Sequence, residues 1–307
     1  MGSFLTTRSR NERLWFINNK ALEDAILGYA AKYRENYSVK LYALAIEGNH
    51  IQATALFPKE NRASFMRDFN AIVARIMQRY VPEYDGGRFW ARRYSSEMLP
   101  GDKDIEDYFF YTVLQAVQDR LVSKISDYPG YNCFHDAIWG IKRKFKVVDW
   151  GKYNDAKRYN RKVRIKDFTT IVTLEYERLP GYENLSQRDY AKLMQKKLEE
   201  RRAKIVAKKL AEGLSFMGRD RLLQMKRGAY PKNPKTSERY SHRPRVLSKC
   251  PKRRAECLAW YFSVFFAYKA ASREYRAGNL DVKFPEGTYK PFYWHKAPTI
   301  GMPPPSS

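Results

Sequence analysis

The pattern of apolar and polar positions is most regular between residues 42 and 57. Two apolar, β-prone runs flank Gly48 and Asn49, residue types that readily take the positive φ of a tight turn, and this predicts a β-hairpin. Side chains alternate across a strand, so His50 and Gln52 share one face, while the apolar set shares the other and can pack on helices. The polar face therefore begins with two metal-capable side chains, roughly 7 Å apart.

Helical periodicity follows on both sides of this hairpin. Residues 21–36, 62–80 and 103–118 have apolar positions at i, i+3 and i+4, which predicts three amphipathic helices. Short β-prone runs at residues 13–17 and 89–94 predict two further strands. Strand, helix, strand, strand, helix is the order of a ferredoxin-like or RRM-like fold. We therefore expect an α+β core with an antiparallel sheet.

The later part of the chain has a different pattern. Ser186 is the expected N-cap of a long helix over residues 187–212, which is dense in Lys and Arg. A turn-rich basic region over residues 218–251 follows, and an aromatic-rich helix over residues 257–276 is expected to bury its aromatic side. The sequence thus predicts a basic, mainly helical extension.

Charge separates these two parts of the chain. The 307 residues have a net charge of +25, of which residues 1–150 contribute +4 and residues 151–307 contribute +21. The chain also has 23 Tyr, 17 Phe and 6 Trp, rings on which bases can stack. This combination favours a nucleic-acid partner. We therefore predict a core domain over residues 1–150 and a nucleic-acid-binding extension over residues 151–307.

A membrane location is not expected. The apolar run of residues 257–269 is shorter than the ~20 residues of a membrane-spanning helix. Three cysteines are too few and too unevenly spaced for a disulfide framework. A reducing cytoplasm, with the protein associated with the nucleoid, is the expected location.

Basic residues in the core and the extension are the expected contacts to DNA phosphates. The candidates are Arg92, Arg93, Lys196, Lys197, Arg201, Arg202, Lys208, Lys209, Arg219, Arg221, Lys226 and Arg227. The alternative interpretation of the charged helix is a solvated face with i,i+4 ion pairs, but its excess of Lys and Arg over Glu is too large for pairing alone.

Tyr111 and Gln115 lie one turn apart on the edge of the apolar stripe of the predicted helix 103–118. An aromatic residue in such a helix is most often a packing residue, and a single strand histidine such as His50 is more often hydrogen-bonded than metal-bound. From the residues alone, both interpretations stay open.

Three segments, taken in order, carry a family likeness. Asn49-His50-Ile51-Gln52 corresponds to an Asn-His-x-His turn and strand, residues 111–122 to a Tyr-Ile-x-x-Asn-Pro-Val-Arg-Ala-Gly-Leu-Val helix end, and residues 127–132 to Asp-Tyr-Pro-x-x-Ser. With these segments the chain resembles the REP-associated tyrosine transposases, bacterial members of the single-tyrosine HUH group. The likeness covers roughly residues 6 to 140.

The resemblance implies an enzyme that nicks and transfers single-stranded or hairpin DNA, with palindromic repeats as its substrate, through a 5′-phosphotyrosine intermediate. By position, Tyr111 would be the nucleophile. His50, Gln52 and Gln115 would hold Mg²⁺ or Mn²⁺, which neutralises charge on the scissile phosphate.

The sequence departs from the family pattern at two places. Gln52 replaces the second histidine, and residues 115–120 lack the Pro and Gly of the family's helix end. A glutamine amide oxygen still binds a hard cation.

Two other functions stay open. One is a catalytically inactive, domesticated DNA- or RNA-binding protein with the same fold, and the other is a ribosome- or RNA-associated basic protein. The active site is also open to completion within one chain or by a second copy in a homodimer.

Overall fold

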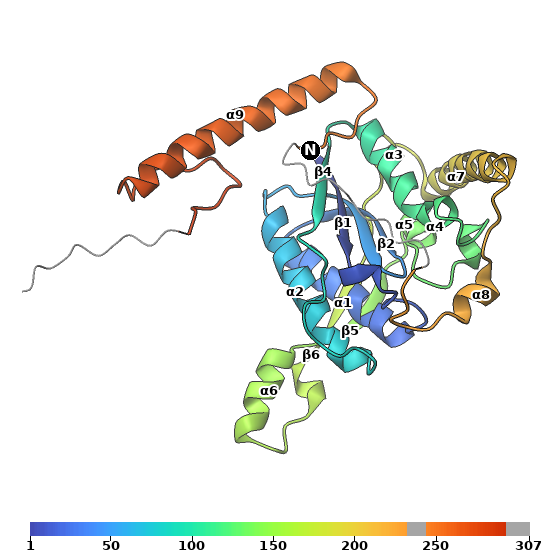
Figure 1. The fold of residues 1–307 in the computed structure, drawn as a ribbon, viewed down its shortest axis with the longest axis horizontal. Coiled ribbons are helices and arrows are strands. Elements are labelled where there is room, and N and C mark those ends of the chain that lie inside the picture. The colour runs from blue at the N-terminus through green and yellow to red at the C-terminus, as the bar shows by residue number, and fades with distance from the viewer. Residues whose placement is uncertain (232–243, 293–307) are drawn as a thin grey trace, which may run out of the picture.

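A computed structural model describes residues 1–231 and 244–292 of the chain. Its centre is a four-stranded antiparallel sheet with the strand order β2-β3-β1-β4 (Figure 1). The strands are β1 (Gly2–Arg8), β2 (Lys40–Ile46), β3 (His50–Leu56) and β4 (Ser95–Leu99). With helices α1 (Lys20–Asn36) and α2 (Arg62–Tyr80) between them, they have the chain order and the sheet order of a ferredoxin-like fold. The predicted α+β class is confirmed.

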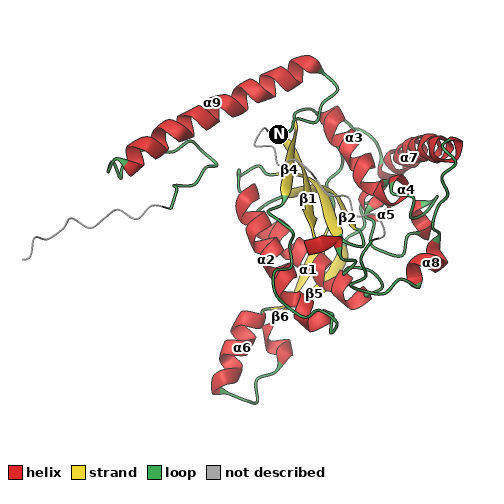
Figure 2. Ribbon diagram, viewed as in Figure 1, coloured by secondary structure: helices red, strands yellow, loops and turns green. Residues whose placement is uncertain are grey.

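Helices cover both faces of this sheet (Figure 2). On one face, α3 (Asp102–Val113) packs on β2 and β3. On the other face, the ring of Phe57 lies 5.6 Å from that of Phe65 on α2, and α1 packs beside α2. The alternation of side chains along β3 therefore separates a polar face under α3 from an apolar face in the main core.

The hairpin and the first two helices match their predictions closely. Asn19 caps α1, since its side chain accepts a hydrogen bond from the backbone N–H of Leu22 at 3.0 Å. The hairpin turn, however, uses no positive φ at Gly48 or Asn49. Gly48 is needed for space instead, because a Cβ there would lie 3.0 Å from the Leu14 side chain.

Two predicted strands are wrong. Residues 13–17 form a loop whose Trp15 and Phe16 are buried, and the first strand lies earlier, at β1. Residues 89–94 form a loop before β4, in which Trp90 makes an isolated bridge to Ser9. In both cases an apolar run fills the core without joining the sheet, a distinction that periodicity does not make.

The predicted helix over residues 103–118 is interrupted. α3 ends at Val113, Leu114 takes non-helical backbone angles, and a short helix α4 (Gln115–Gln118) follows. Asn132 compensates the interruption, because its side-chain amide donates to the backbone oxygen of Val113 at 2.7 Å. Helix α5 (Phe134–Trp139) comes directly after this residue.

A second, two-stranded antiparallel sheet packs on α1. Its strands are β5 (Arg143–Val148) and β6 (Thr169–Leu174), and the connection between them contains α6 (Trp150–Tyr159) and a short 3-10 helix, η3 (Ile165–Phe168). α6 projects from the body of the protein at the bottom of Figure 1. β5 comes before residue 150 and β6 comes after it, so one sheet contains strands from both predicted domains. The functional division of the chain near that residue stays a prediction.

Three helices follow β6 in the described part of the chain: α7 (Gln187–Ala211), α8 (Arg219–Leu223) and α9 (Pro251–Arg276). Ser186 caps α7 as predicted, with its hydroxyl accepting from the backbone N–H of Asp189 at 3.1 Å. Tyr190, Met194 and Leu198 of α7 are buried in the main core. α7 is thus part of the globular body.

The prediction that the aromatic-rich helix buries its aromatic side is wrong. α9 projects along the top of the molecule (Figure 1), and Trp260 and Phe266 are 53% and 61% exposed. Its Cys257 is buried against Met98 of β4. Aromatic residues occur around the whole helix, so one contact side cannot cover them all. The sequence after this helix predicts an extended segment over residues 284–294, of which residues 293 and 294 lie outside the described residues.

Segments of the same chain pair with both outer strands of the main sheet. Next to β4, Met98 donates its backbone N–H to Arg245 O and accepts from Leu247 N, both at 2.9 Å. Next to β2, Leu41 O accepts from Glu177 N at 2.8 Å, and Leu44 O accepts from Cys133 N at 3.2 Å.

In the portion that the structure describes, no helix has the length and apolarity needed to cross a membrane.

Candidate active site

Strand β3 presents His50 and Gln52 on its polar face, directly after the hairpin turn. Both side chains are buried at 3% exposure, and the Nε2 atoms of the two residues are 3.1 Å apart. The period of two along a strand brings them together, as the sequence predicts.

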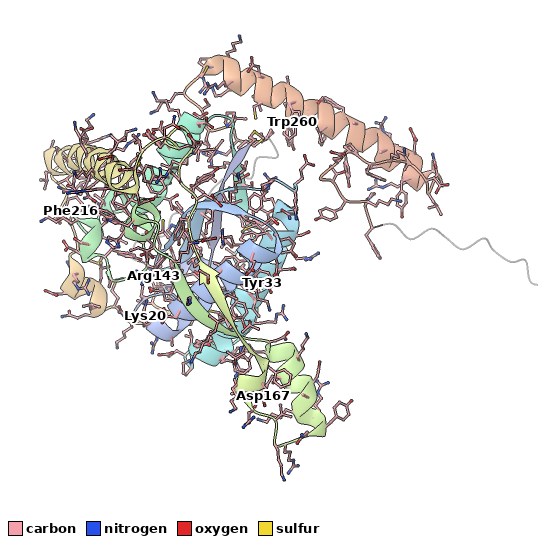
Figure 3. The ribbon with its side chains drawn as sticks, turned by 180° about the vertical axis from the view of Figure 1, so that it is seen from behind. Lys20, Tyr33, Arg143, Asp167, Phe216 and Trp260 are labelled. Carbon is pink, nitrogen blue, oxygen red and sulfur yellow. The ribbon has the colours of Figure 1, made fainter. Side chains whose placement is uncertain are left out.

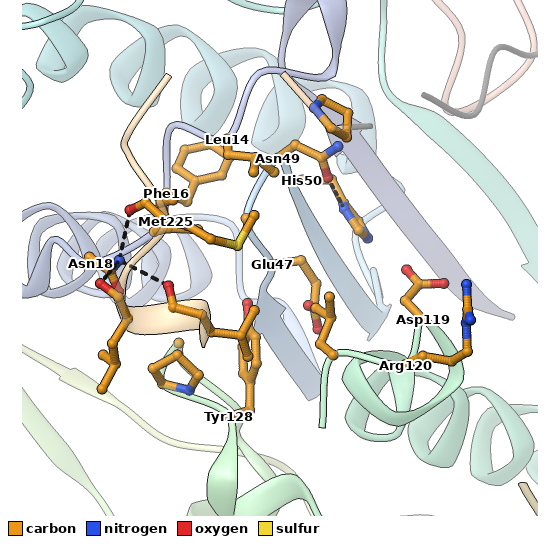
Figure 4. Close-up of a pocket in the computed structure, with 18 of the residues that line it drawn as sticks. Leu14, Phe16, Asn18, Glu47, Asn49, His50, Asp119, Arg120, Tyr128 and Met225 are labelled. Carbon is orange, nitrogen blue, oxygen red and sulfur yellow. Dashed lines mark hydrogen bonds between the residues drawn. The ribbon is translucent and has the colours of Figure 1, made fainter. Parts of the chain in front are cut away.

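Asn49 fixes the orientation of the His50 ring. The Asn49 Oδ1 atom lies 2.7 Å from His50 Nδ1 (Figure 4). An amide oxygen only accepts, so we assign the proton to Nδ1 and the lone pair to Nε2. Such a partner on the far nitrogen is typical of a metal-binding histidine.

Two threonines hold α3 against this strand. Thr54 Oγ1 lies 3.2 Å from Thr112 Oγ1 and donates to the backbone oxygen of Tyr108 at 3.2 Å. This contact holds the C-terminal part of α3, which contains Tyr111, near β3, and Gln115 follows at the start of α4. Tyr111 is half-buried, and its ring packs edge-on against Phe4 at 5.4 Å.

Gln115 opens the short helix α4 and is 4% exposed. Its Nε2 atom donates to Asp119 Oδ2 at 2.9 Å, which fixes the direction of the amide. Asp119 is a site residue that the sequence reasoning missed, although the i,i+4 spacing of a Gln and an Asp on a helix is a recognisable signal.

The amide oxygens of Gln52 and Gln115 are buried, and neither accepts a hydrogen bond. A buried acceptor without a partner costs about 1–3 kcal/mol, so such atoms call for an explanation. Two amide oxygens and one imidazole nitrogen are a donor set that suits Mg²⁺ or Mn²⁺. The residues present therefore fit the metal that the resemblance implies.

No group of three or more His, Cys, Asp or Glu side chains suited to a metal occurs in residues 1–231 and 244–292. A metal site built on β3 thus depends on glutamine oxygens.

A pocket of about 760 Å³ opens beside this cluster (Figure 4). His50, Gln118 and Asp119 line one part of it. Five cationic side chains also line the pocket: Arg8, Lys20, Arg120, Lys209 and Arg219. Four carboxyl groups line it too, of which Glu12 lies 3.6 Å from Arg8 and Glu23 lies 2.6 Å from Lys20, so the excess of cationic side chains is small. That excess still favours an anionic ligand such as a phosphodiester.

Glu47 lies in the wall of the same pocket and is 2% exposed. Burial, and after it the nearby carboxylate of Asp119, raise the pKa of Glu47, and the Tyr128 hydroxyl opposes them with a smaller effect. The resulting pKa is about 8. At neutral pH Glu47 is therefore mostly a neutral acid. It consequently adds little negative charge where a phosphate would enter.

We expect wild-type stability to fall by on the order of 1–3 kcal/mol as the pH rises from 5 to 8.5, and that of Glu47→Gln to fall less. In the unfolded chain the carboxyl ionises near its ordinary pKa of 4.5, so protons favour the folded state between about 4.5 and 8. Urea unfolding at both pH values measures this difference. Parallel pH profiles for the two proteins would contradict it.

The third family-like segment has a structural role. The Tyr128 hydroxyl donates to the backbone oxygen of Ile46 at 3.1 Å, and Asn132 binds the end of α3. These contacts tie the loop after α4 to the end of β2, next to the hairpin turn.

Some candidate DNA contacts make internal ion pairs. Lys197 binds Glu106 at 2.8 Å, Arg201 binds Asp107 at 2.8 Å, and Arg227 binds Glu83 at 2.8 Å. Arg202 binds Glu199 at 2.7 Å. The pairs of Lys197 and Arg201 fasten α7 to α3. Their DNA contacts stay a prediction, with this structural role beside it.

The remaining candidates make no ion pair shorter than 3.8 Å within the described residues. Lys208 and Lys209 lie 4.0 and 3.8 Å from Glu212, and Arg219 lies 3.4 Å from the backbone oxygen of Asp127. The other candidates are all exposed on the surface: Arg92, Arg93, Lys196, Arg221 and Lys226.

Comparisons with known proteins find similarity to transposases. Residues 5–111 match the sequence model of the IS200-like transposases. A curated relative from Haemophilus influenzae (strain ATCC 51907 / DSM 11121 / KW20 / Rd), named as a REP-associated tyrosine transposase, is 24% identical over 148 residues, which is 44% of this chain and 82% of the relative. A solved structure of a REP-associated tyrosine transposase bound to a REP hairpin aligns with a TM-score of 0.37 and 18% identity, over 44% of this chain and 76% of that one.

Proposed function

We propose that this protein nicks single-stranded or hairpin DNA and transfers the cut strand through a covalent bond to Tyr111, because residues 5–111 match the sequence model of the IS200-like transposases. The relative named as a REP-associated tyrosine transposase supports a palindromic-repeat hairpin as the substrate.

One observation carries the catalytic part of this proposal. Gln52 has a buried, unbonded amide oxygen next to His50 on β3, and Gln115 has another at the start of α4, directly after the helix that the Thr54–Thr112 contact holds to β3. Without a ligand, burying these oxygens lowers the stability of the folded state, and no hydrogen bond offsets the loss. We assign them, with His50, to Mg²⁺ or Mn²⁺, which when bound would polarise the scissile phosphate.

The chain's own residues then perform three tasks. Cationic side chains around the pocket attract the DNA backbone, and Arg8 and Arg120 line it together with His50. The Tyr111 oxygen attacks phosphorus and forms a phosphotyrosine bond to the 5′ side of the cut. The bond from phosphorus to the 3′ oxygen breaks, and that oxygen leaves as a 3′-hydroxyl. Positioning and charge neutralisation carry most of such a reaction.

The inactive, domesticated binding protein remains the second candidate because of one contact. Gln52 Nε2 lies 3.1 Å from His50 Nε2, where an amide N–H occupies the lone pair that a metal would use. Under this alternative the cluster satisfies itself and the protein only binds DNA or RNA.

An adduct assay separates the two candidates. Labelled hairpin and single-stranded oligonucleotides from repeats that flank the gene would be incubated with the protein and Mn²⁺, Mg²⁺ or EDTA. We expect an SDS-resistant protein–DNA band with either metal, its loss in EDTA, and its return when excess Mn²⁺ is added. Tight, salt-sensitive binding with no band under any condition would establish the binding protein instead.

A further inference from the structure

The segment from β5 to β6, residues 143–174, forms a basic arm outside the part of the chain that matches the transposase family. It has 10 Lys and Arg residues against 3 Asp. Figure 3 shows Arg143 at the base of the arm and Asp167 on its projecting part. The predicted nucleic-acid-binding extension over residues 151–307 includes most of this arm, but none of the candidate DNA contacts named above lies on it.

The base of the arm is built into the fold. Gly28 of α1 leaves room for it, because a Cβ there would lie 2.9 Å from Val147 and 3.2 Å from Phe145. The Tyr29 hydroxyl also donates to the backbone oxygen of Val148 at 3.0 Å. The arm is consequently held in one position on α1.

The projecting part has its own small aromatic core. The Trp150 and Tyr153 rings lie 5.8 Å apart, and the Phe168 ring lies 5.9 Å from that of Tyr153. The guanidinium of Arg79 on α2 stacks 3.3 Å from the centre of the Trp150 ring. These contacts order α6 and turn Trp150 and Tyr153 inward, while Tyr159 at its end is exposed.

Most cations of the arm face solvent without an acidic partner. Arg158 and Arg164 pair with Asp155 and Asp167, both at 3.4 Å. Six others are exposed and make no ion pair within the described residues: Lys144, Lys146, Lys152, Arg161, Lys162 and Lys166. A rigid surface with this density of unpaired charge suits a regular polyanion.

The lack of stacking surfaces indicates the form of that polyanion. Proteins bind single strands by combining a cationic groove with exposed aromatic platforms. On the projecting part of the arm, from Trp150 to Phe168, Tyr159 is the one strongly exposed ring, at 93%. Charge without stacking platforms is what the phosphate backbone of a duplex requires.

We propose that the basic arm is a second DNA-binding surface that contacts the backbone of duplex DNA, the hairpin stem or the flanking duplex, without reading its sequence. This inference rests on the proposed DNA-processing function. It places the duplex contact on the α1 side of the sheet, while the cluster on β3 acts on the strand to be cut.

The test compares two variants with equal loss of charge. The arm variant combines Lys152→Gln, Arg161→Gln, Lys162→Gln and Lys166→Gln. The control variant combines Lys40→Gln, Lys59→Gln, Lys103→Gln and Lys283→Gln, which are exposed, make no ion pair within the described residues, and lie outside the arm. Circular dichroism would verify that both variants fold.

Dissociation constants would be measured over a salt series for a long-stemmed hairpin and for a short single strand. For the arm variant we expect hairpin affinity to fall at least tenfold and the slope of log K against log salt to decrease by about 3–4, from roughly 0.9 per phosphate contact. Single-strand affinity and the control variant should change much less.

Two results would overturn the inference while leaving the proposed function intact: equal hairpin affinity of the arm and control variants, or an equal loss of affinity for hairpin and single strand. Failure of the wild-type protein to bind any DNA would reject the proposed function itself.

Discussion

Tyr111→Phe is expected to abolish the covalent protein–DNA adduct while DNA binding stays unchanged. The substitution removes only the hydroxyl oxygen that would bond to phosphorus. The ring keeps its edge-on contact with Phe4 and its contact with Tyr108, whose ring lies 5.4 Å away. An SDS gel with labelled hairpin measures the adduct, and a filter-binding assay measures affinity.

Tyr108→Phe is the matched control, since Tyr108 lies one turn earlier on the same helix. Burial, Glu97 and Tyr111 together raise the pKa of Tyr108 to about 12, so very little of its hydroxyl is ionised at neutral pH. We expect this variant to retain the adduct. An adduct that survives Tyr111→Phe but disappears with Tyr108→Phe would move the nucleophile to the neighbouring tyrosine.

Gln52→Ala should lower the rate of adduct formation roughly 100-fold and shift its Mn²⁺ dependence to higher concentration. The variant removes one of the four buried amide oxygens that have no hydrogen bond in the described residues, namely the one next to His50. A titration of the rate with Mn²⁺ separates weaker metal binding from a general loss of activity.

Gln52→His restores the side chain that the family has at this position and should retain activity. An imidazole provides one nitrogen ligand where the amide provides one oxygen. If Gln52→Ala were as active as wild type at every Mn²⁺ concentration, Gln52 would not be a metal ligand. If both variants were inactive, the position would be important for packing instead.

Much of the fold could be predicted from the sequence because it follows from local periodicity. The hairpin at β2 and β3 and the helices α1 and α2 have long, regular patterns, and α1 and α7 have side-chain caps. The first strand, β1, could not be found from the sequence. It lies between β3 and β4, so its Ser and Thr residues are largely buried and its sequence shows no alternation of apolar and polar side chains.

The candidate site was predictable only in part. The period of a strand pairs His50 with Gln52, and helical spacing puts Tyr111 and Gln115 on one side, so these residues follow from local geometry. The break at Leu114 is accompanied by the contact of Asn132 with Val113, and Asn132 is distant in sequence from β3. Tertiary contacts of this kind leave no periodic signal.

Pairing of chain segments with β2 and β4 has a consequence for assembly. An outer strand with free backbone groups is a template on which another sheet can extend. Here Leu41 and Leu44 on one edge and Met98 on the other already have hydrogen bonds to loops of the same chain. Two copies could merge their sheets only by first breaking these hydrogen bonds. Sheet-to-sheet association and aggregation through the sheet edges are therefore both disfavoured.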